Sequence, residues 1–138
     1  PTELNANNLA LKAKYEQMKR EEIQFEAYNA DTDYKVLITS YGTMSRVCRT
    51  AIDMLKEEGI EVAMLRPKTL FPFPEQAVHE AAAKESCKSV ISIEMSMGQM
   101  VEDVERAVKG QRPVEFYGEC GGDIPSPEKI IDIIKAML

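Results

Sequence analysis

The sequence lacks tryptophan, contains one histidine and has three cysteines among 138 residues. Cys48, Cys87 and Cys120 are too far apart for a CxxC pair, and His79 alone cannot complete a zinc site with them. An odd, widely spaced set is no disulfide framework, so we expect reduced, mostly structural thiols, as in a cytoplasmic protein. With no second imidazole to activate a serine or cysteine, the composition also disfavours nucleophilic catalysis.

Positive charge is scarce as well. The chain has 17 Lys and Arg residues and 23 Asp and Glu residues, which gives a formal net charge of -6. Nucleic acids and anionic membranes both attract a basic patch, so neither is expected as a partner. No apolar run approaches the roughly 18 residues of a transmembrane helix, and no secretory leader is visible. At 44% hydrophobic and 29% charged residues, the composition is that of one ordinary globular domain.

The glycine-rich loops that cradle phosphates are also absent. A dinucleotide site needs G-x-G-x-x-G after the first strand, where only Gly42 is found, and a P-loop motif is missing. A receiver domain would need an acidic pair after the first strand, where Thr39 and Ser40 stand instead, and a phosphorylatable Asp at a later strand end, where Glu94 stands. The sequence therefore disfavours all three classes.

Residues 1–30 differ in composition from the rest of the chain. Leu4, Leu11, Met18 and Phe25 recur every seven residues, which predicts a long helix that ends at the turn over residues 29–33. We interpret it as a connecting helix that lies across its own domain or a neighbour; a short coiled coil is the weaker alternative. The predicted division is a linker helix, 1–30, and an α/β domain, 31–138.

From residue 34 onward strands and helices alternate. Four units in sequence predict a three-layer α/β/α domain with a mostly parallel sheet of four to five strands. Loops that follow such strands gather at one edge of the sheet, where ligands usually bind. The expected strands cover residues 36–38, 60–65, 90–93 and 114–116.

Helix boundaries carry local signals. Thr43 is expected to cap the first helix of the domain and Gly59 to end it. Pro74 suits the first position of the next helix, and Ser126 with Pro127 predicts the start of the last one.

Three loop segments hold apolar residues that core packing does not explain. They are residues 71–74, 94–100 and 121–125. Such residues tuck beneath the domain or contact a second domain or subunit. A small-ligand site is disfavoured, because the polar groups needed to orient a ligand are few.

These segments, in this order, resemble a known family. Residues 41–43, 58–62, 65–74, 94–100 and 121–127 are similar to the second domain of 2-oxoacid:ferredoxin oxidoreductase α subunits. The resemblance covers about residues 30–138, and the preceding helix resembles the linker of the branched-chain 2-oxoacid and 2-oxoglutarate members.

The resemblance implies a fold like the transketolase C-terminal domain, with five strands, one of them antiparallel. The fifth strand is expected at residues 67–71 or outside the chain. It also implies a parent enzyme that decarboxylates a 2-oxoacid on thiamine diphosphate with Mg²⁺, and passes electrons through iron–sulfur clusters to ferredoxin and the acyl group to coenzyme A. In the family, other domains and subunits hold these groups, so we expect no catalytic residue, cofactor or metal in this chain.

The predicted role is therefore a non-catalytic scaffold, inactive alone, that contacts the thiamine-binding first domain and other subunits. The loop-edge and interface candidates are Tyr41, Arg66, Phe73, Glu94, Met97, Gln99 and Asp123. The alternative is a free-standing α/β protein that binds an anion or small acid at the same edge. Its expected donors are Arg66, Lys68 and the amides of Gly42 and Gly98.

Overall fold

A computed structural model describes residues 2–138, apart from the side chain of Lys19. The helices are α1 (Thr2–Glu21), α2 (Gly42–Glu57), α3 (Glu75–Ala83), α4 (Met100–Val108) and α5 (Pro127–Met137). The strands are β1 (Phe25–Tyr28), β2 (Val36–Ser40), β3 (Val62–Pro67), β4 (Ser89–Glu94) and β5 (Val114–Gly118).

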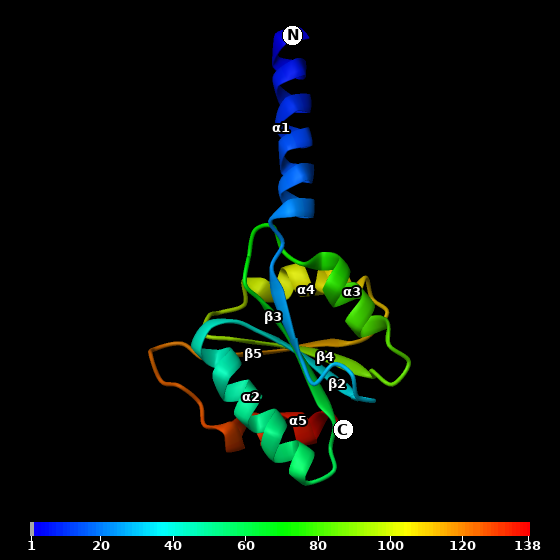
Figure 1. Cartoon of the computed structure of the whole chain (residues 1–138). Helices are drawn as coiled ribbons and strands as arrows, with labels where there is room; N and C mark the ends of the chain where they lie inside the picture. Colours follow the sequence, from blue (N-terminus) through cyan, green and yellow to red (C-terminus); the bar gives the residue numbers. More distant parts are fainter. Residues whose placement is uncertain (1) are drawn as a thin grey trace.

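Within residues 2–138 the strands form one sheet in the order β1-β3-β2-β4-β5. Strands β3, β2, β4 and β5 are parallel, and β1 runs antiparallel to β3. Helices cover both faces of this sheet (Figure 1). The expected three-layer α/β fold with a mostly parallel sheet is confirmed.

The place predicted for the fifth strand was wrong. It is β1, in which Phe25 pairs with Pro67 and Tyr28 with Met64. The first helix accordingly ends at Glu21 and does not continue to the turn at residues 29–33. A strand of four residues alternates too briefly to reveal a period of two, so the seven-residue spacing that included Phe25 suggested a helix instead.

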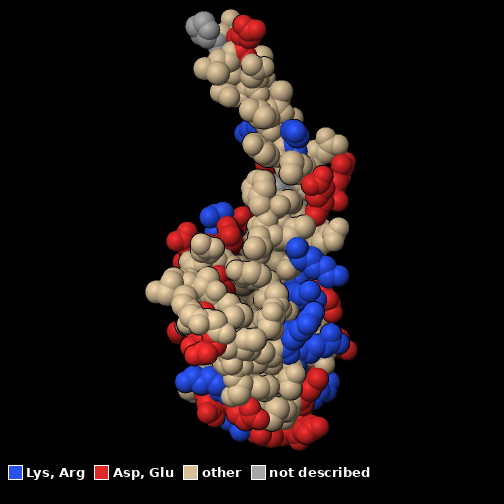
Figure 2. All heavy atoms as spheres, turned by 90° about the vertical axis from the view of Figure 1, so that its left-hand side faces the viewer, with Lys and Arg blue, Asp and Glu red and all other residues tan. Residues whose placement is uncertain are grey.

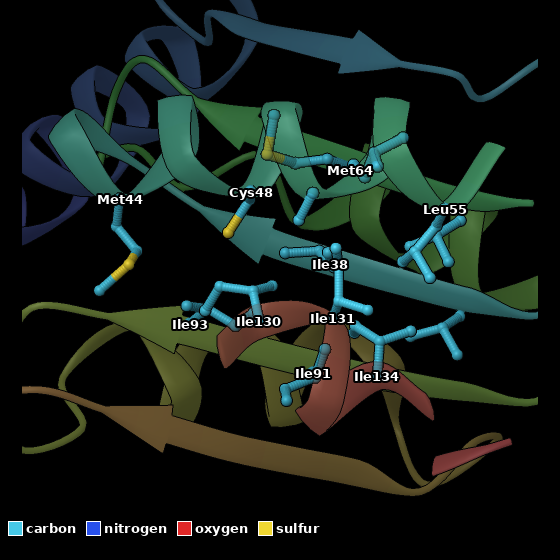
Figure 3. Close-up of a cluster of buried hydrophobic side chains, with 14 residues drawn as sticks. Ile38, Met44, Cys48, Leu55, Met64, Ile91, Ile93, Ile130, Ile131 and Ile134 are labelled. Atoms are coloured by element: carbon cyan, nitrogen blue, oxygen red, sulfur yellow. The ribbon is translucent and has the colours of Figure 1, made fainter. Parts of the chain in front are cut away.

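The two faces of the sheet have separate cores. On one face Ile38 and Ile91 pack with Cys48 of α2 and Ile130 of α5, as Figure 3 shows. On the other face the alternate strand residues, such as Leu37, pack against α3 and α4. Successive side chains of a strand point to opposite faces, so strands covered on both sides read as continuous apolar runs.

Helix α1 stands away from the body (Figure 1). Leu4 and Leu11 of the predicted stripe are 66% and 48% exposed. At its base the ring of Tyr15 meets that of Phe71 edge-on, with centroids 6.1 Å apart and planes at 80°. The helix does not lie across its own domain; a neighbour or a short coiled coil stays the prediction for its apolar stripe.

The helix ends were predicted in part. Ser126 caps α5, accepting a hydrogen bond from the Lys129 amide, and Gly59 follows α2 with φ +80°. Tyr41, not Thr43, is the N-cap of α2, because the helix already begins at Gly42.

Candidate functional site

The loops after β2, β3, β4 and β5 gather at one edge of the body, as their parallel order requires. This edge lies on the left in Figure 1 and faces the viewer in Figure 2. Figure 2 shows a broad uncharged area there, with Lys and Arg gathered along one side. The candidate residues from the sequence divide into those that line this edge and those buried beneath it.

Glu94 is fully buried and has a structural position. Its Oε1 accepts hydrogen bonds from the Ser96 hydroxyl at 3.1 Å and the Met100 amide at 2.7 Å. Its Oε2 accepts from the Ser92 hydroxyl and the Val101 amide, both at 3.0 Å. Because the two amides open α4, this carboxylate at the end of β4 satisfies helix donors that have no partner within the helix. The side chain is not available to a partner at the surface.

The loop after β4 is held tightly against the end of β5. A Cβ atom added to Gly118 would lie 2.3 Å from the Ser96 carbonyl oxygen, a distance that no side chain tolerates. Gly98 has φ +107°, and a Cβ there would lie 3.4 Å from the Phe116 ring. The loop that carries the methionines is thus fixed at both ends, by Glu94 and by β5.

Four apolar side chains on this loop, β5 and the following loop are exposed, and we call them the apolar surface. Their exposed fractions are 39% for Met95, 86% for Met97, 41% for Phe116 and 54% for Ile124. Single exposed apolar residues are ordinary, but several on adjoining segments of one edge are typical of interaction sites. Methionine is common on such surfaces, because its flexible thioether adapts to the partner.

Three further candidates accompany the apolar surface. Gln99 and Asp123 are exposed on the same loops. Tyr41 is half-buried before α2, where burial and then the nearby charge of Glu94 raise the pKa of its hydroxyl. A neutral phenol and two exposed polar groups suit hydrogen bonding across an interface.

The other two candidates lie elsewhere. Phe73 is 8% exposed and belongs to the core beneath α3 and α4, so its ring serves the interior. Arg66 ends β3 on the side of α2, and its Nη1 lies 3.4 Å from Oε2 of Glu26. The apolar residues that do emerge from the loop after β3 are Leu70 and Phe71.

A hollow of about 670 Å³ lies between the base of α1, the start of α3 and the side of α4. Leu70 and Phe71 line one side of it, and Asp103 and Arg106 line another. Arg106 pairs with Asp103 at 3.3 Å and with Glu75 at 3.6 Å. The charge of Arg106 is therefore paired within the chain.

Two of the three cysteines are buried, and the histidine is hydrogen-bonded within the domain. Burial raises the pKa of Cys48 to about 12 and also raises that of Cys87, so both stay protonated in the folded protein. The Nδ1 atom of His79 lies 2.9 Å from the Ala107 carbonyl oxygen and 3.2 Å from the side-chain Nε2 of Gln111. Cys120 is exposed on the loop after β5.

Two of the four donors in the anion-binding alternative are already engaged. The Gly98 amide donates to the Ser96 hydroxyl at 3.3 Å, and Arg66 pairs with Glu26. Lys68 and Gly42 are exposed.

Within residues 2–138, no group of three or more His, Cys, Asp or Glu side chains is placed to hold a metal ion. None of the helices in that range has the length and apolarity needed to cross a membrane.

Comparison with known families gives a match over most of the chain. The family model described as "Pyruvate:ferredoxin oxidoreductase core domain II" matches residues 34–130. Ketoisovalerate oxidoreductase subunit VorB of Methanothermobacter thermautotrophicus is 39% identical over 96% of this chain and 37% of its own length. The 2-oxoglutarate synthase subunit KorA of Methanothermobacter marburgensis is 36% identical over 76% of this chain and 28% of its own. The chain thus spans 37% and 28% of the lengths of these two curated relatives.

Solved structures agree in fold. A 2-oxoglutarate:ferredoxin oxidoreductase from Magnetococcus marinus, solved with 2-oxoglutarate, coenzyme A and succinyl-CoA bound, aligns with TM-score 0.65 and 25% identity. The alignment covers 82% of this chain and 19% of that one. A split-gene transketolase aligns over 74% of this chain and 37% of its own with TM-score 0.58 and 16% identity, which supports the fold. With its sheet order, its family model and its relatives in agreement, the chain belongs to the 2-oxoacid:ferredoxin oxidoreductase family as a core domain II.

Proposed function

We propose that this chain is a non-catalytic scaffold domain of the α subunit of a thiamine-diphosphate-dependent 2-oxoacid:ferredoxin oxidoreductase. The observation that carries the proposal is the apolar surface, with Met97 86% exposed on a loop that Glu94 and Gly118 hold in place. A rigid apolar surface binds a partner with little loss of conformational entropy. Helix α1 acts as the linker, and the docked domain begins with β1, which pairs with β3.

In the parent enzyme, the oxidative decarboxylation of 2-oxoglutarate or 2-oxoisovalerate to an acyl-CoA takes place on other domains. Thiamine diphosphate, Mg²⁺ and iron–sulfur clusters bind there, with ferredoxin and coenzyme A as co-substrates. The partners of this chain are the thiamine-binding first domain and other subunits, in the cytoplasm. The names of the VorB and KorA relatives support this family of reactions.

A denaturing immunoblot of source cells, with an antibody raised against this chain, tests the first part of the proposal. We expect a band well above the 15.5 kDa of the chain and co-purification of 2-oxoacid oxidoreductase activity with that band. A dominant band at the mass of the chain, together with specific thermal stabilisation by pyrophosphate or a 2-oxoacid, would favour the free-standing anion-binding protein instead.

A further inference from the structure

Three arginines gather beside the loop edge, between α2 and the β1–β3 side of the sheet. Arg46 and Arg49 project from the first two turns of α2, and Arg66 comes from the end of β3. One carboxylate, Glu26 of β1, serves two of them: Arg49 Nη1 lies 3.8 Å from its Oε1 and Arg66 Nη1 lies 3.4 Å from its Oε2. In a chain of net charge -6, this is a local excess of positive charge.

The remaining groups around the arginines do not remove that excess. Arg49 stacks on the ring of Tyr28, with its guanidinium carbon 4.3 Å from the centroid. The Tyr28 hydroxyl donates to Asp53, the next carboxylate along α2. Among residues 2–138 no ion pair forms with Arg46, which is exposed. A guanidinium offers five N–H donors, so most of those in this cluster are free to bind an anion.

The size of the site limits the kind of anion. The arginines border a hollow of about 40 Å³, which Ser45 and Met64 also line. A hollow this small holds a few water-sized groups, which suits a single carboxylate better than a nucleotide. A carboxylate that protrudes from a polypeptide fits these dimensions.

The position of the cluster favours a protein partner. Figure 2 shows Lys and Arg gathered along one side of the uncharged area at the loop edge. Protein interfaces commonly have an apolar centre and a polar rim, and charged groups at the rim steer and orient the partner. This edge of the molecule thus combines an uncharged centre with a basic side, an arrangement that suits one interface.

We propose that Arg46, Arg49 and Arg66 dock an aspartate or glutamate side chain from an acidic segment of a partner subunit. This proposal rests on the function proposed above and adds the chemistry of the partner. Paired N–H donors of arginine match the two oxygens of a carboxylate, which gives orientation as well as attraction.

The test uses Arg46→Lys in the parent complex and a carbodiimide that joins an amine to a carboxylate in direct contact. The carbodiimide adds to the carboxylate to form an O-acylisourea, and the lysine amine attacks the carbonyl carbon of that ester. An amide bond forms and the reagent leaves as a urea. We expect the peptide that contains residue 46 to be joined to an Asp or Glu of a partner subunit, as identified by mass spectrometry. The unsubstituted complex is the matched control, because arginine does not form this bond.

A second variant tests the energy of the contact. Arg46→Glu with Arg49→Glu should weaken assembly at least tenfold at low salt, with the difference shrinking as salt screens the charges. Arg49 also pairs with Glu26 and stacks on Tyr28, so Arg46→Glu alone serves as the folding control. Arg46 is exposed, and the melting temperature of the isolated chain with this single substitution should remain close to that of the unsubstituted chain.

The outcomes separate the two proposals. If the unsubstituted chain assembles but position 46 links only to Glu26 or to nothing, the acidic partner is refuted and the scaffold role stands. Stabilisation by inorganic pyrophosphate that is lost in Arg46→Glu would likewise refute it in favour of a small anion. If the unsubstituted chain joins no larger complex, the proposed function itself fails.

Discussion

At the scale of the residue, Glu94 shows how a buried charge organises the loop edge. Each of its two oxygens accepts one hydroxyl and one backbone amide. A fully buried carboxylate is tolerated when its hydrogen bonds are complete. The sequence placed this acid correctly at a strand end but suggested an exposed role, because burial and partners are not visible in sequence.

Replacing Glu94 with glutamine should destabilise the domain by about 1–3 kcal/mol. The amide nitrogen of the glutamine would take the place of one carboxylate oxygen. It donates hydrogen bonds, so it cannot accept the one from the backbone amide that this oxygen receives in the parent sequence. The free energy of unfolding in urea measures the effect, with the exposed Glu105→Gln on α4 as a control that should change it by less than about 0.5 kcal/mol. Equal stability of the two variants would mean that the carboxylate does not hold α4.

Cys48 gives a prediction for alkaline pH. The thiol ionises near 9.0 when unfolded and at about 12 when folded, because burial favours the neutral form. Between these values the unfolded state releases a proton that the folded state keeps, so the free energy of unfolding falls as pH rises. We expect this contribution to approach about 1.4 kcal/mol per pH unit.

Cys48→Ala removes that contribution. Urea unfolding at several pH values between about 8 and about 11 should show a shallower decline for the variant than for the parent sequence. The comparison uses slopes, so the cavity left by the smaller side chain does not affect it. Parallel slopes would show that the buried thiol titrates as it does in the unfolded chain.

At the scale of the element, α1 and α2 contrast. They have 20 and 16 residues, yet α2 buries six side chains while α1 touches the body at its base. A solitary helix of this length is marginal in water. Hydrogen exchange measured by mass spectrometry on the isolated chain should find α1 amides exchanging fast and α2 amides protected.

Protection of α1 equal to that of α2 in the isolated chain would contradict this account. Protection that appears in the parent complex would identify α1 as a second contact with a neighbour. Either comparison uses α2 as the internal reference, since both helices belong to the same molecule.

The same elements show what the sequence reveals. Strands β2 and β4 are buried on both faces and appear in the sequence as apolar runs. The start of α5 could be predicted from Ser126 and Pro127. Strand β1 has no such signal in the sequence, because its four residues are alternately exposed and half-buried at the sheet edge. Its place is determined by pairing with β3, a contact across about 40 residues that no local pattern records.

At the scale of the whole molecule, the alternation of strands and helices in the sequence was enough to predict the fold. The candidate site could be predicted only in part. The parallel strand order brings the loops singled out in the sequence to one edge, and Met97 is exposed there. Phe73 looked equivalent in its motif but packs inward, and Arg46 and Arg49 carried no signal beyond a helical spacing. Which side of a loop faces solvent depends on packing that the sequence does not display.

Met97→Glu should disrupt assembly of the parent complex, because it places a charge at the centre of the apolar surface. The matched control is Leu138→Glu: Leu138 is 56% exposed and lies beside Gly59 and Ile60, at the opposite edge. Size-exclusion chromatography should show loss of the complex for the first variant alone. Normal assembly of Met97→Glu would remove the apolar surface from the interface.

The direct join between α1 and the sheet has a mechanical consequence. Only residues 22–24 separate the helix from β1, which pairs antiparallel with β3. A helix of 20 residues extends about 30 Å, so a small tilt at its base becomes a much larger sweep at its tip. A sideways force on that tip would therefore act through a long lever arm on the base of the helix, where Tyr15 meets Phe71 and the chain enters a strand of only four residues.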